Sequence, residues 1–345
     1  MILKSFNYSS KNWNLDTLSL DKTNLIVGKN SAGKTRALVA LMEIQKLLSQ
    51  EIEIDKLDKF EAELSFARNE EEIRLSLKIS PKEIISERLT VNGKNIIVRE
   101  KGKAIIAGKE VNPPADKLLL HVHRDTATLP DIEDLISWGK KSVVRYFTDT
   151  QKPTSEQIYK IVSQFSDEMK QHVVEMANEV GFPLTRMDTF DKMFDLKLNK
   201  IKSDEIKHVL FQEEGVMPML FLKDMSNGMQ RTILMLIFIE AISKYNYSAL
   251  IAIDDLGEGL DYERSTKLGK LMFETCEKNN VQLIATSNED FLMNIIDIDK
   301  WNILVRSGHK VRSITSKSAP EVFKEFRFSG LNNFDFFTSD IFNRL

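Results

Sequence analysis

Short, continuously apolar runs alternate along the chain with longer patterns of helical period. The apolar runs are Asn24 to Val27, Ser248 to Ile253 and the run that begins at Val281. Runs of this kind are typical of strands buried on both faces of a parallel sheet. The helical patterns lie at 35–48, 229–242 and 262–279. This alternation predicts an α/β fold with a mainly parallel core sheet.

Strand patterns of another kind surround the first apolar run. Ile2 to Tyr8 and Trp13 to Leu20 predict two antiparallel strands that lead into it. Residues 59–112 then alternate charged and β-branched stretches, with turn signals at Asn92-Gly93 and Lys101-Gly102. We therefore expect an antiparallel β lobe beside the parallel core.

A further strand is expected from Lys117 to Val122, returning to the main sheet. It would carry His121 and place His123, Arg124 and Asp125 at its end. The two histidines are spaced to share one face of a strand, but no Cys or third His accompanies them. A hydrogen-bonded structural pair is therefore favoured over a metal site. Arg124 as a sensor of nucleotide or partner is a hypothesis.

Helical patterns broken by turn signals fill residues 128–195. We expect helices at Pro130 to Phe147, Thr154 to Phe165 and Ser166 to Val180, with breaks at Lys152-Pro153 and Gly181-Phe182-Pro183. Thr154 and Gln157 have the spacing of a capping box. The insertion is either a platform for a partner or ordinary packing.

The length of 345 residues and the 42% hydrophobic composition allow a sizeable core. We expect a single domain, 1–345, made of three segments. They are an amino-terminal lobe at 1–127, a helical insertion at 128–205 and a lobe at 206–345.

The first apolar run leads into Gly28-Lys29-Asn30-Ser31-Ala32-Gly33-Lys34-Thr35, which has the form G-x-x-x-x-G-K-[ST]. In such a loop, backbone N–H groups wrap a β-phosphate and the amino end of the next helix faces the anion. Lys34 is expected to reach the β- and γ-phosphates, and Thr35 to offer its hydroxyl to Mg²⁺. The segment predicts bound ATP or GTP with Mg²⁺.

Two carboxylates follow the second apolar run. Asp254 and Asp255 stand at the carboxyl end of the predicted strand, where open α/β sheets place their ligands. Asp254 is expected to hold Mg²⁺ through water, and Asp255 to orient or deprotonate the attacking water. The alternative for an isolated pair is a solvated turn.

A third segment identifies the class of nucleotide site. Met225-Ser226-Asn227-Gly228-Met229-Gln230-Arg231 resembles the L-S-G-G-Q signature of ABC-type ATPases, and 254–261 aligns on their Walker B and D-loop. Ser226 stands where an N-cap would, so the helix after it can aim its amides at a γ-phosphate. The chain thus resembles an ABC-type ATPase head, although a capped core helix without a ligand is the alternative.

This resemblance implies a P-loop NTPase fold of ABC-ATPase type with ATP and Mg²⁺ as cofactors. It also implies a homodimer through ATP, with possible higher assembly, in which Ser226 and Gly228 of one protomer face the phosphate loop of the other and Asp261 lies near the joint. The nucleotide-binding residues implied outside the phosphate loop are Ser226, Gly228, Gln230 and Asp261. The catalytic residues would be Asp255, Lys34 and Ser287.

Spacing narrows the branch of the superfamily. The long separation of Lys34 and Ser226 is unlike that in transporters, and no long heptad pattern fills it. The chain resembles the compact heads of the SMC, RecF and OLD families, including bacterial and phage-defence ATPases. This implies a nucleotide-gated clamp or sensor that controls a separate effector in anti-phage defence. The alternatives are a RecF-type repair or recombination ATPase and an ATP-binding module with negligible turnover.

Two departures from the family pattern predict slow or partner-stimulated hydrolysis. Asp255 replaces the usual Glu and is shorter by one methylene, so the base would stand farther from its water. Ser287, followed by Asn288, stands where the family places His. Either can hydrogen-bond a γ-phosphate, but neither carries an imidazole's charge.

Composition indicates the surroundings of the protein. The single cysteine, Cys276, permits no internal disulfide and lies in a helical pattern, where a core role is favoured over a nucleophile. No signal peptide is evident, and the apolar run 232–242 is too short to span a membrane. We expect a cytoplasmic protein without a membrane partner.

The net charge of −3 gives no global indication of nucleic acid. Local basic stretches are solvated faces or, as the alternative, a groove for a DNA or RNA backbone. They comprise Lys140-Lys141 with Arg145, then Lys197, Lys200, Lys202 and Lys207, then His309-Lys310 with Arg312. The aromatic tail is either docked in the core or a partner surface. Its residues are Phe323, Phe326, Phe328, Phe334, Phe336, Phe337 and Phe342.

Overall fold

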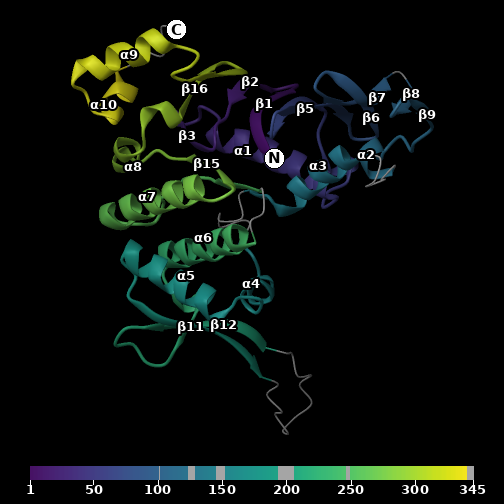
Figure 1. Ribbon diagram of the computed structural model, residues 1–345. Coiled ribbons are helices and arrows are strands. Elements are labelled where there is room, and N and C mark those ends of the chain that lie inside the picture. The colour runs from purple at the N-terminus through teal and green to yellow at the C-terminus, as the bar shows by residue number, and fades with distance from the viewer. Residues whose placement is uncertain (101, 123–128, 145–151, 193–205, 246–248, 340–345) are drawn as a thin grey trace. The chain divides into compact units, whose positions relative to one another are not determined.

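The computed structural model describes all residues except 101, 123–128, 145–151, 193–205, 246–248 and 340–345 (Figure 1). The chain divides into two compact units. Unit 1 comprises Met1–Arg145, Ser248–Asp255 and Asn280–Leu345, and unit 2 comprises Tyr146–Tyr247 and Leu256–Asn279. These units cut across the three expected segments, so the division at residues 127 and 205 stays a prediction.

The described strands of unit 1 form one 14-stranded sheet. Its parallel part runs in the order β10 (Val143–Val144), β14 (Ala249–Ile253), β15 (Val281–Thr286), β3 (Thr23–Val27) and β16 (Trp301–Ser307). Every residue of β3, β14 and β15 is buried, because both faces of these strands are covered. The expected buried strands and the parallel core are confirmed.

The sheet continues from β16 into a mainly antiparallel part, whose first two strands pair in parallel with each other. The strands that follow in order are β17 (Lys310–Ile314), β2 (Trp13–Ser19), β1 (Ile2–Ser10), β4 (Phe60–Arg68), β5 (Glu71–Ser80), β6 (Glu83–Val91), β7 (Lys94–Glu100), β8 (Lys103–Ile106) and β9 (Lys109–Val111). Asn92 and Gly93 turn with positive φ between β6 and β7, as their sequence predicts. The antiparallel lobe is confirmed, and it shares one sheet with the parallel core.

Helix α1 (Lys34–Ser49) packs against α3 (Pro130–Lys141), and Gln45 Nε2 donates to the Gly139 carbonyl at 2.5 Å. The expected helix from Pro130 to Phe147 is too long. Ser142 ends it in extended backbone, and β10 then pairs with β14. The Ser142 hydroxyl also accepts from the Leu250 N–H at 3.1 Å, so the strand pairing outweighs the helical pattern here.

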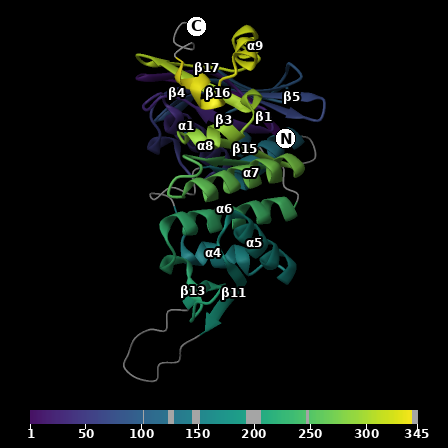
Figure 2. The same cartoon turned by 90° about the vertical axis from the view of Figure 1, so that its left-hand side faces the viewer.

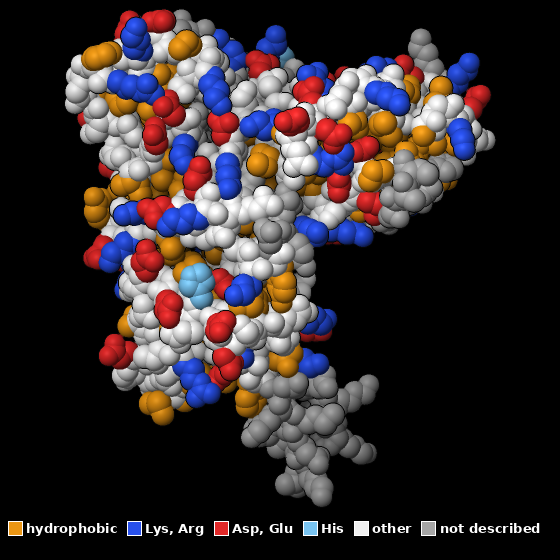
Figure 3. Space-filling view, in the orientation of Figure 1, with side chains coloured by type: hydrophobic (Ala, Val, Ile, Leu, Met, Phe, Trp, Pro, Cys, Tyr) orange, Lys and Arg blue, Asp and Glu red, His pale blue; other side chains and the backbone are white. Residues whose placement is uncertain are grey.

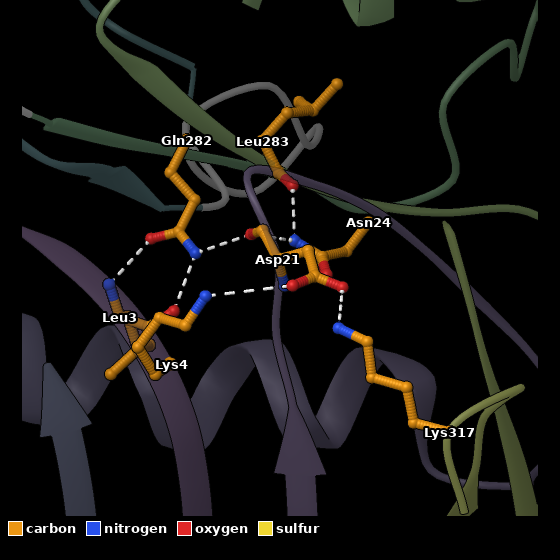
Figure 4. Close-up of polar contacts among 7 residues, drawn as sticks. All are labelled: Leu3, Lys4, Asp21, Asn24, Gln282, Leu283 and Lys317. Atoms are coloured by element: carbon orange, nitrogen blue, oxygen red, sulfur yellow. Dashed lines mark hydrogen bonds and ion pairs between the residues drawn. The ribbon is translucent and has the colours of Figure 1, made fainter. Parts of the chain in front are cut away.

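Buried amides join the strands at the amino end of β3 (Figure 4). Gln282 accepts from the Leu3 N–H and donates to the Leu3 and Asp21 carbonyls, at 2.7–2.9 Å. Asn24 donates to the carbonyls of Asp21 and Leu283. Each bond satisfies a buried polar group, so the network fixes β1 and β15 against β3.

The expected strand from Lys117 to Val122 is wrong. The chain forms a short helix there, α2 (Leu119–Val122), because the N–H groups of Leu119 and Leu120 donate to the buried carboxylate of Glu87 rather than to a strand. His121 Nε2 lies 3.1 Å from the Leu48 carbonyl, which fits the expected structural role. His123, Arg124 and Asp125 lie outside the described residues.

Unit 2 layers helices over a small sheet, as Figures 1 and 2 show. Its elements are α4 (Ser155–Val162), α5 (Asp167–Val180), β11 (Leu184–Lys192), β12 (Ile206–Glu213), β13 (Leu220–Phe221), α6 (Asn227–Lys244) and α7 (Tyr262–Lys278). The capping box of Thr154 and Gln157 is present, and Gly181 ends α5 in left-handed backbone, as expected. Strands β11 and β12 were missed by the sequence analysis.

The tail of unit 1 packs through its rings. It contains α9 (Pro320–Ser329) and α10 (Asn333–Thr338), and α10 contacts α8 (Asp290–Ile295). Outside the tail, the chain also forms short 3₁₀ turns at Ile54–Lys56, Leu222–Asp224 and Ile298–Lys300. Phe326 and Phe336 stack at 4.1 Å between centroids, and Phe323 meets Phe336 edge-on. Phe328 is 82% exposed, so the tail is docked only in part. Phe342 lies outside the described residues.

Two further expectations concern single features. Cys276 is fully buried in α7, as a core residue would be. Within the described part of the chain, no helix has the length and apolar character to cross a membrane. A cytoplasmic location stays a prediction.

The buried Glu87 predicts a pH-dependent stability. Burial raises the pKa of Glu87 to about 7, against the lowering effect of its two N–H donors and Arg99. Between its ordinary pKa and 7 the folded state keeps a proton that the unfolded state loses, so the free energy of unfolding falls as pH rises. Urea denaturation at pH 5 and pH 8 should show a loss of up to about 3 kcal/mol that Glu87→Gln removes. The exposed neighbour Glu83 gives the control, Glu83→Gln; equal pH slopes in all three proteins would contradict the prediction.

Candidate functional site

The phosphate-loop segment forms a compact turn between β3 and α1. The Ala32 N–H donates to the Lys29 carbonyl at 2.9 Å, and Ser31 and Gly33 both have positive φ. A Cβ at Gly33 would lie 3.2 Å from Trp13 Nε1, so a side chain there meets both strain and crowding. The loop therefore exposes its backbone to the space in front of α1, as a phosphate cradle requires.

Lys34 is buried at the start of α1 and folds back over the loop. Its ammonium donates to the Gly28 carbonyl at 2.7 Å and to Asn288 Oδ1 at 2.6 Å. Desolvation lowers the pKa of Lys34, while the nearby carboxylates of Asp255 and Asp254 oppose this. The ammonium is thus preorganised among neutral acceptors that an anion can replace.

The two carboxylates stand at the carboxyl end of β14, beside those of β15 and β3. Asp254 Oδ1 accepts from the Thr286 hydroxyl at 2.9 Å and from the Thr35 hydroxyl at 3.3 Å. The Thr286 hydroxyl in turn accepts from the Asp255 N–H at 2.7 Å, and Asp255 takes left-handed backbone, with φ of 51°. Thr286 therefore positions both acids, a role that the sequence analysis missed.

The donors near Asp254 fit a magnesium ion. Mg²⁺ prefers hard oxygen ligands and is held in nucleotide sites by one or two protein oxygens, water and phosphates. Thr35 and Asp254 supply a hydroxyl and a carboxylate oxygen side by side. Outside this pair, the described residues contain no group of three His, Cys, Asp or Glu side chains that could hold a metal ion.

The two polar residues after β15 are placed differently. Ser287 is 1% exposed, and its hydroxyl accepts from the Glu289 N–H at 3.0 Å. Asn288 is exposed and meets Lys34. Asn288 is therefore the residue that faces the site, while the hydroxyl of Ser287 shapes the turn into α8.

Lys34, Thr35, Asp255 and Asn288 line a cavity of about 550 Å³. Trp13, Arg36 and Val39 line the same cavity, and the guanidinium of Arg36 lies 5.1 Å from the ring centroid of the buried Trp13. The sequence analysis missed the roles of Trp13 and Arg36. The available signal was a bulky aromatic residue, Trp13, at the start of β2.

The signature segment is organised within unit 2. Ser226 caps α6, its hydroxyl accepting from the Met229 N–H at 3.3 Å. Gln230 Nε2 donates to the Met225 carbonyl at 2.7 Å, so this side chain braces the loop from within. Ser226 is exposed at the start of this 18-residue helix, while Gly228 and Met229 of its first turn are buried.

The D-loop packs directly on the signature. A Cβ at Gly228 would lie 2.3 Å from the Gly259 carbonyl oxygen, and Arg231 Nη1 donates to Glu258 Oε2 at 2.6 Å. Asp261 caps α7, accepting from the Arg264 N–H at 3.0 Å. The pKa of Asp261 is lowered, and this hydrogen bond from the Arg264 N–H is the largest cause.

The predicted site residues therefore fall into two sets. Unit 1 brings together the phosphate loop, Asp254, Asp255 and the turn at Ser287. Unit 2 brings together Ser226, Gly228, Gln230 and Asp261, with Gln230 and Asp261 engaged in local bonds.

The contact between Gly228 and Gly259 predicts an unusual sign for a helix substitution. Gly→Ala inside a helix ordinarily stabilises by about 1 kcal/mol. Gly228→Ala should instead destabilise by about 1–3 kcal/mol, because the methyl group overlaps a carbonyl that cannot move alone. Thermal melting of this variant and of Asn227→Ala, its exposed neighbour, tests the point. A Gly228→Ala protein as stable as the unmodified chain would contradict the packing.

Comparison with known proteins gives the fold. No family model and no curated protein matches the sequence. An SMC head bound to the C-winged helix domain of ScpA matches with a TM-score of 0.59 and 15% identity, over 93% of this chain and 100% of that one. A Pyrococcus furiosus SMC head domain with an extended coiled coil, bound to the C-terminal domain of ScpA, matches with a TM-score of 0.56 and 13% identity, over 94% and 99%. The chain has the fold of SMC head domains, which confirms the predicted ABC-type ATPase fold.

Proposed function

We propose that the chain binds ATP with Mg²⁺, that two copies close on the bound nucleotide, and that slow hydrolysis lets them part. The observation that carries this proposal is the convergence of Lys34, Thr35, Asp254 and Asp255 at the carboxyl ends of adjacent strands. Such a set answers the needs of a triphosphate and its metal, since each residue type matches one charge or ligand.

The roles follow from the contacts. The Lys34 ammonium exchanges a neutral acceptor for a β- or γ-phosphate oxygen, which strengthens the bond because both partners are then charged. Thr35 and Asp254 hold Mg²⁺, which neutralises phosphate charge. Arg36, backed by Trp13, offers a planar cation in the same cavity, suited to a base or an α-phosphate.

The dimer is supported by the signature loop of unit 2. Ser226 is exposed and caps α6, an 18-residue helix whose positive amino end suits an anion supplied by another molecule. The SMC head fold supports the same arrangement. A γ-phosphate that contacts both protomers favours the closed state by contacts that ADP lacks.

Slow turnover is supported by Asp255 and by the turn after β15, which carries Ser287 and Asn288. An Asp reaches less far than a Glu toward an attacking water. Thr286 fixes the backbone of Asp255, and Asn288 is bound to Lys34. The side chain of Asp255 is therefore short, and its backbone is fixed by Thr286. A fast steady-state rate of ATP hydrolysis by the isolated protein would contradict slow turnover.

A separate partner protein is part of the proposal, since both SMC head neighbours are bound to domains of ScpA. Control of an effector in anti-phage defence and RecF-type repair stay predictions from the resemblance. For nucleic acid, the face drawn in Figure 3 intermixes Lys and Arg with Asp and Glu, which favours solvated surfaces there. Arg145, Lys197, Lys200 and Lys202 lie outside the described residues.

Mixing two inactive variants tests the shared site. Lys34→Ala removes the phosphate-loop cation and Ser226→Arg blocks the signature, so each homodimer should be inactive. A mixed dimer carries one intact composite site, and random pairing should restore about a quarter of the unmodified ATPase activity. The readout is hydrolysis of labelled ATP, with melting curves showing that both variants fold. Folded variants whose mixture stays inactive would refute a site shared between protomers.

The length of the base is tested at Asp255. Asp255→Glu should raise turnover about 10-fold, because the carboxylate then reaches its water, and Asp255→Asn should lower it at least about 10-fold. ATP affinity, measured by calorimetry, should change little in either variant. Unchanged turnover in Asp255→Asn would remove this carboxylate from the mechanism.

A further inference from the structure

A second cavity, of about 460 Å³, lies against the phosphate loop of unit 1. One wall is the loop itself, from Lys29 to Ala32. The floor is β16, from Ile303 to Arg306, and Phe337 of α10 closes it. Its size is that of ordinary small-molecule sites.

The lining selects the chemistry of a ligand. Lys29 and Arg306 are both exposed cations, while the described lining contains no acidic side chain. The floor and the half-buried Phe337 ring are apolar. A cavity with two cations and an aromatic wall favours an anion that carries a flat apolar body, because both parts are then desolvated against matching groups.

Arg306 connects this cavity to the nucleotide site. Its Nη1 donates to the Ser31 carbonyl at 3.1 Å and its Nε to the Gly308 carbonyl at 2.8 Å. Ser31 has φ of 65°, an uncommon backbone state that needs support from its surroundings. Arg306, Ser31 and Asn30 line both cavities. A ligand that draws on Arg306 therefore acts on the loop that cradles the phosphates.

A second connection runs through the tail. Asn333 Nδ2 donates to the carbonyls of Met293 and Ile296, and the Phe334 N–H donates to Asn294 Oδ1, all at 3.0 Å. These bonds fix α10 to α8, and α8 follows directly on the turn that carries Asn288. The wall made by Phe337 is thus tied to the residue that meets Lys34.

We propose that this second cavity binds a small organic anion with a flat apolar body, and that its occupancy changes nucleotide affinity through Arg306 and the α10–α8 contact. Ile303 to Val305 and Phe337 line this cavity but not the nucleotide cavity, so its ligand regulates rather than replaces ATP. Linkage requires the effect to be reciprocal: the nucleotide changes the affinity of the anion by the same factor.

The probe is 8-anilinonaphthalene-1-sulfonate, an aromatic sulfonate whose fluorescence rises in apolar sites. The full chain, saturated with ADP·Mg²⁺, should bind it at one saturable site. Phe337→Ala removes the ring, and Val305→Glu places a carboxylate in the floor, so each should weaken binding about 10-fold or more. Phe328→Ala is the matched control, since this 82% exposed ring lies on the neighbouring helix away from the lining.

The charge requirement is tested by displacement. 1-Naphthoate should displace the probe, and the neutral 1-naphthylmethanol should need about a 10-fold higher concentration. Equal displacement by both compounds would overturn the assignment of an anion. Unchanged probe binding in Phe337→Ala and Val305→Glu, or an equal loss in Phe328→Ala, would overturn the site itself.

Coupling is measured by calorimetric titration of ADP with and without saturating 1-naphthoate. ADP affinity should change about 5-fold in the unmodified chain and remain unchanged in Phe337→Ala. An unaltered ADP affinity at saturation would overturn the regulatory part. Probe binding is measured independently of ATP hydrolysis, so failure of the proposed clamp and failure of this site give different results.

Discussion

The hydrogen bonds of the Thr286 hydroxyl hold the nucleotide site together. It donates to Asp254 and accepts from the Asp255 N–H, so one side chain at the end of β15 fixes both acids at the end of β14. Asp254 also accepts from Thr35 at the start of α1. This geometry exists only because β14, β15 and β3 are adjacent and parallel, which brings their carboxyl ends to one edge. The chemistry of the site is therefore a consequence of strand order.

In unit 2, local contacts organise the amino end of α6. Ser226 uses its hydroxyl for the cap and Gln230 braces the loop, while the D-loop fits against Gly228 without room for a side chain. The Met229 N–H is thereby satisfied within the unit, and the amino end of α6 keeps the partial positive charge of a helix terminus. Under the proposed function, the two sets of residues would together complete the coordination of a triphosphate, and assembly would then depend on the nucleotide.

The predictable features were those with a strong local cause. The phosphate loop, the buried strands, the capping box at Thr154 and the cap at Ser226 each follow from residue types at fixed spacing. The 117–122 segment failed because a distant buried carboxylate, Glu87, satisfied its N–H groups. Trp13 and Arg306 were missed for a similar reason, since β2 and the β16–β17 hairpin meet the loop only through sheet pairing. Long-range contacts of this kind leave no periodic trace in the sequence.

The hydrogen bonds of Lys34 link the phosphate loop to the turn after β15. Its ammonium donates to the Gly28 carbonyl and to Asn288 Oδ1, so the turn after β15 is bonded to the phosphate loop. A γ-phosphate competes for the same ammonium and, being charged, wins that competition. Under the proposed function, a γ-phosphate would replace Asn288 as an acceptor of Lys34, and the turn that leads to α8 would lose this bond to the loop. ADP has no γ-phosphate, so it would displace Asn288 from Lys34 less completely than ATP would. Lys34 therefore joins the phosphate loop to the turn before α8, and α8 in turn is bonded to α10.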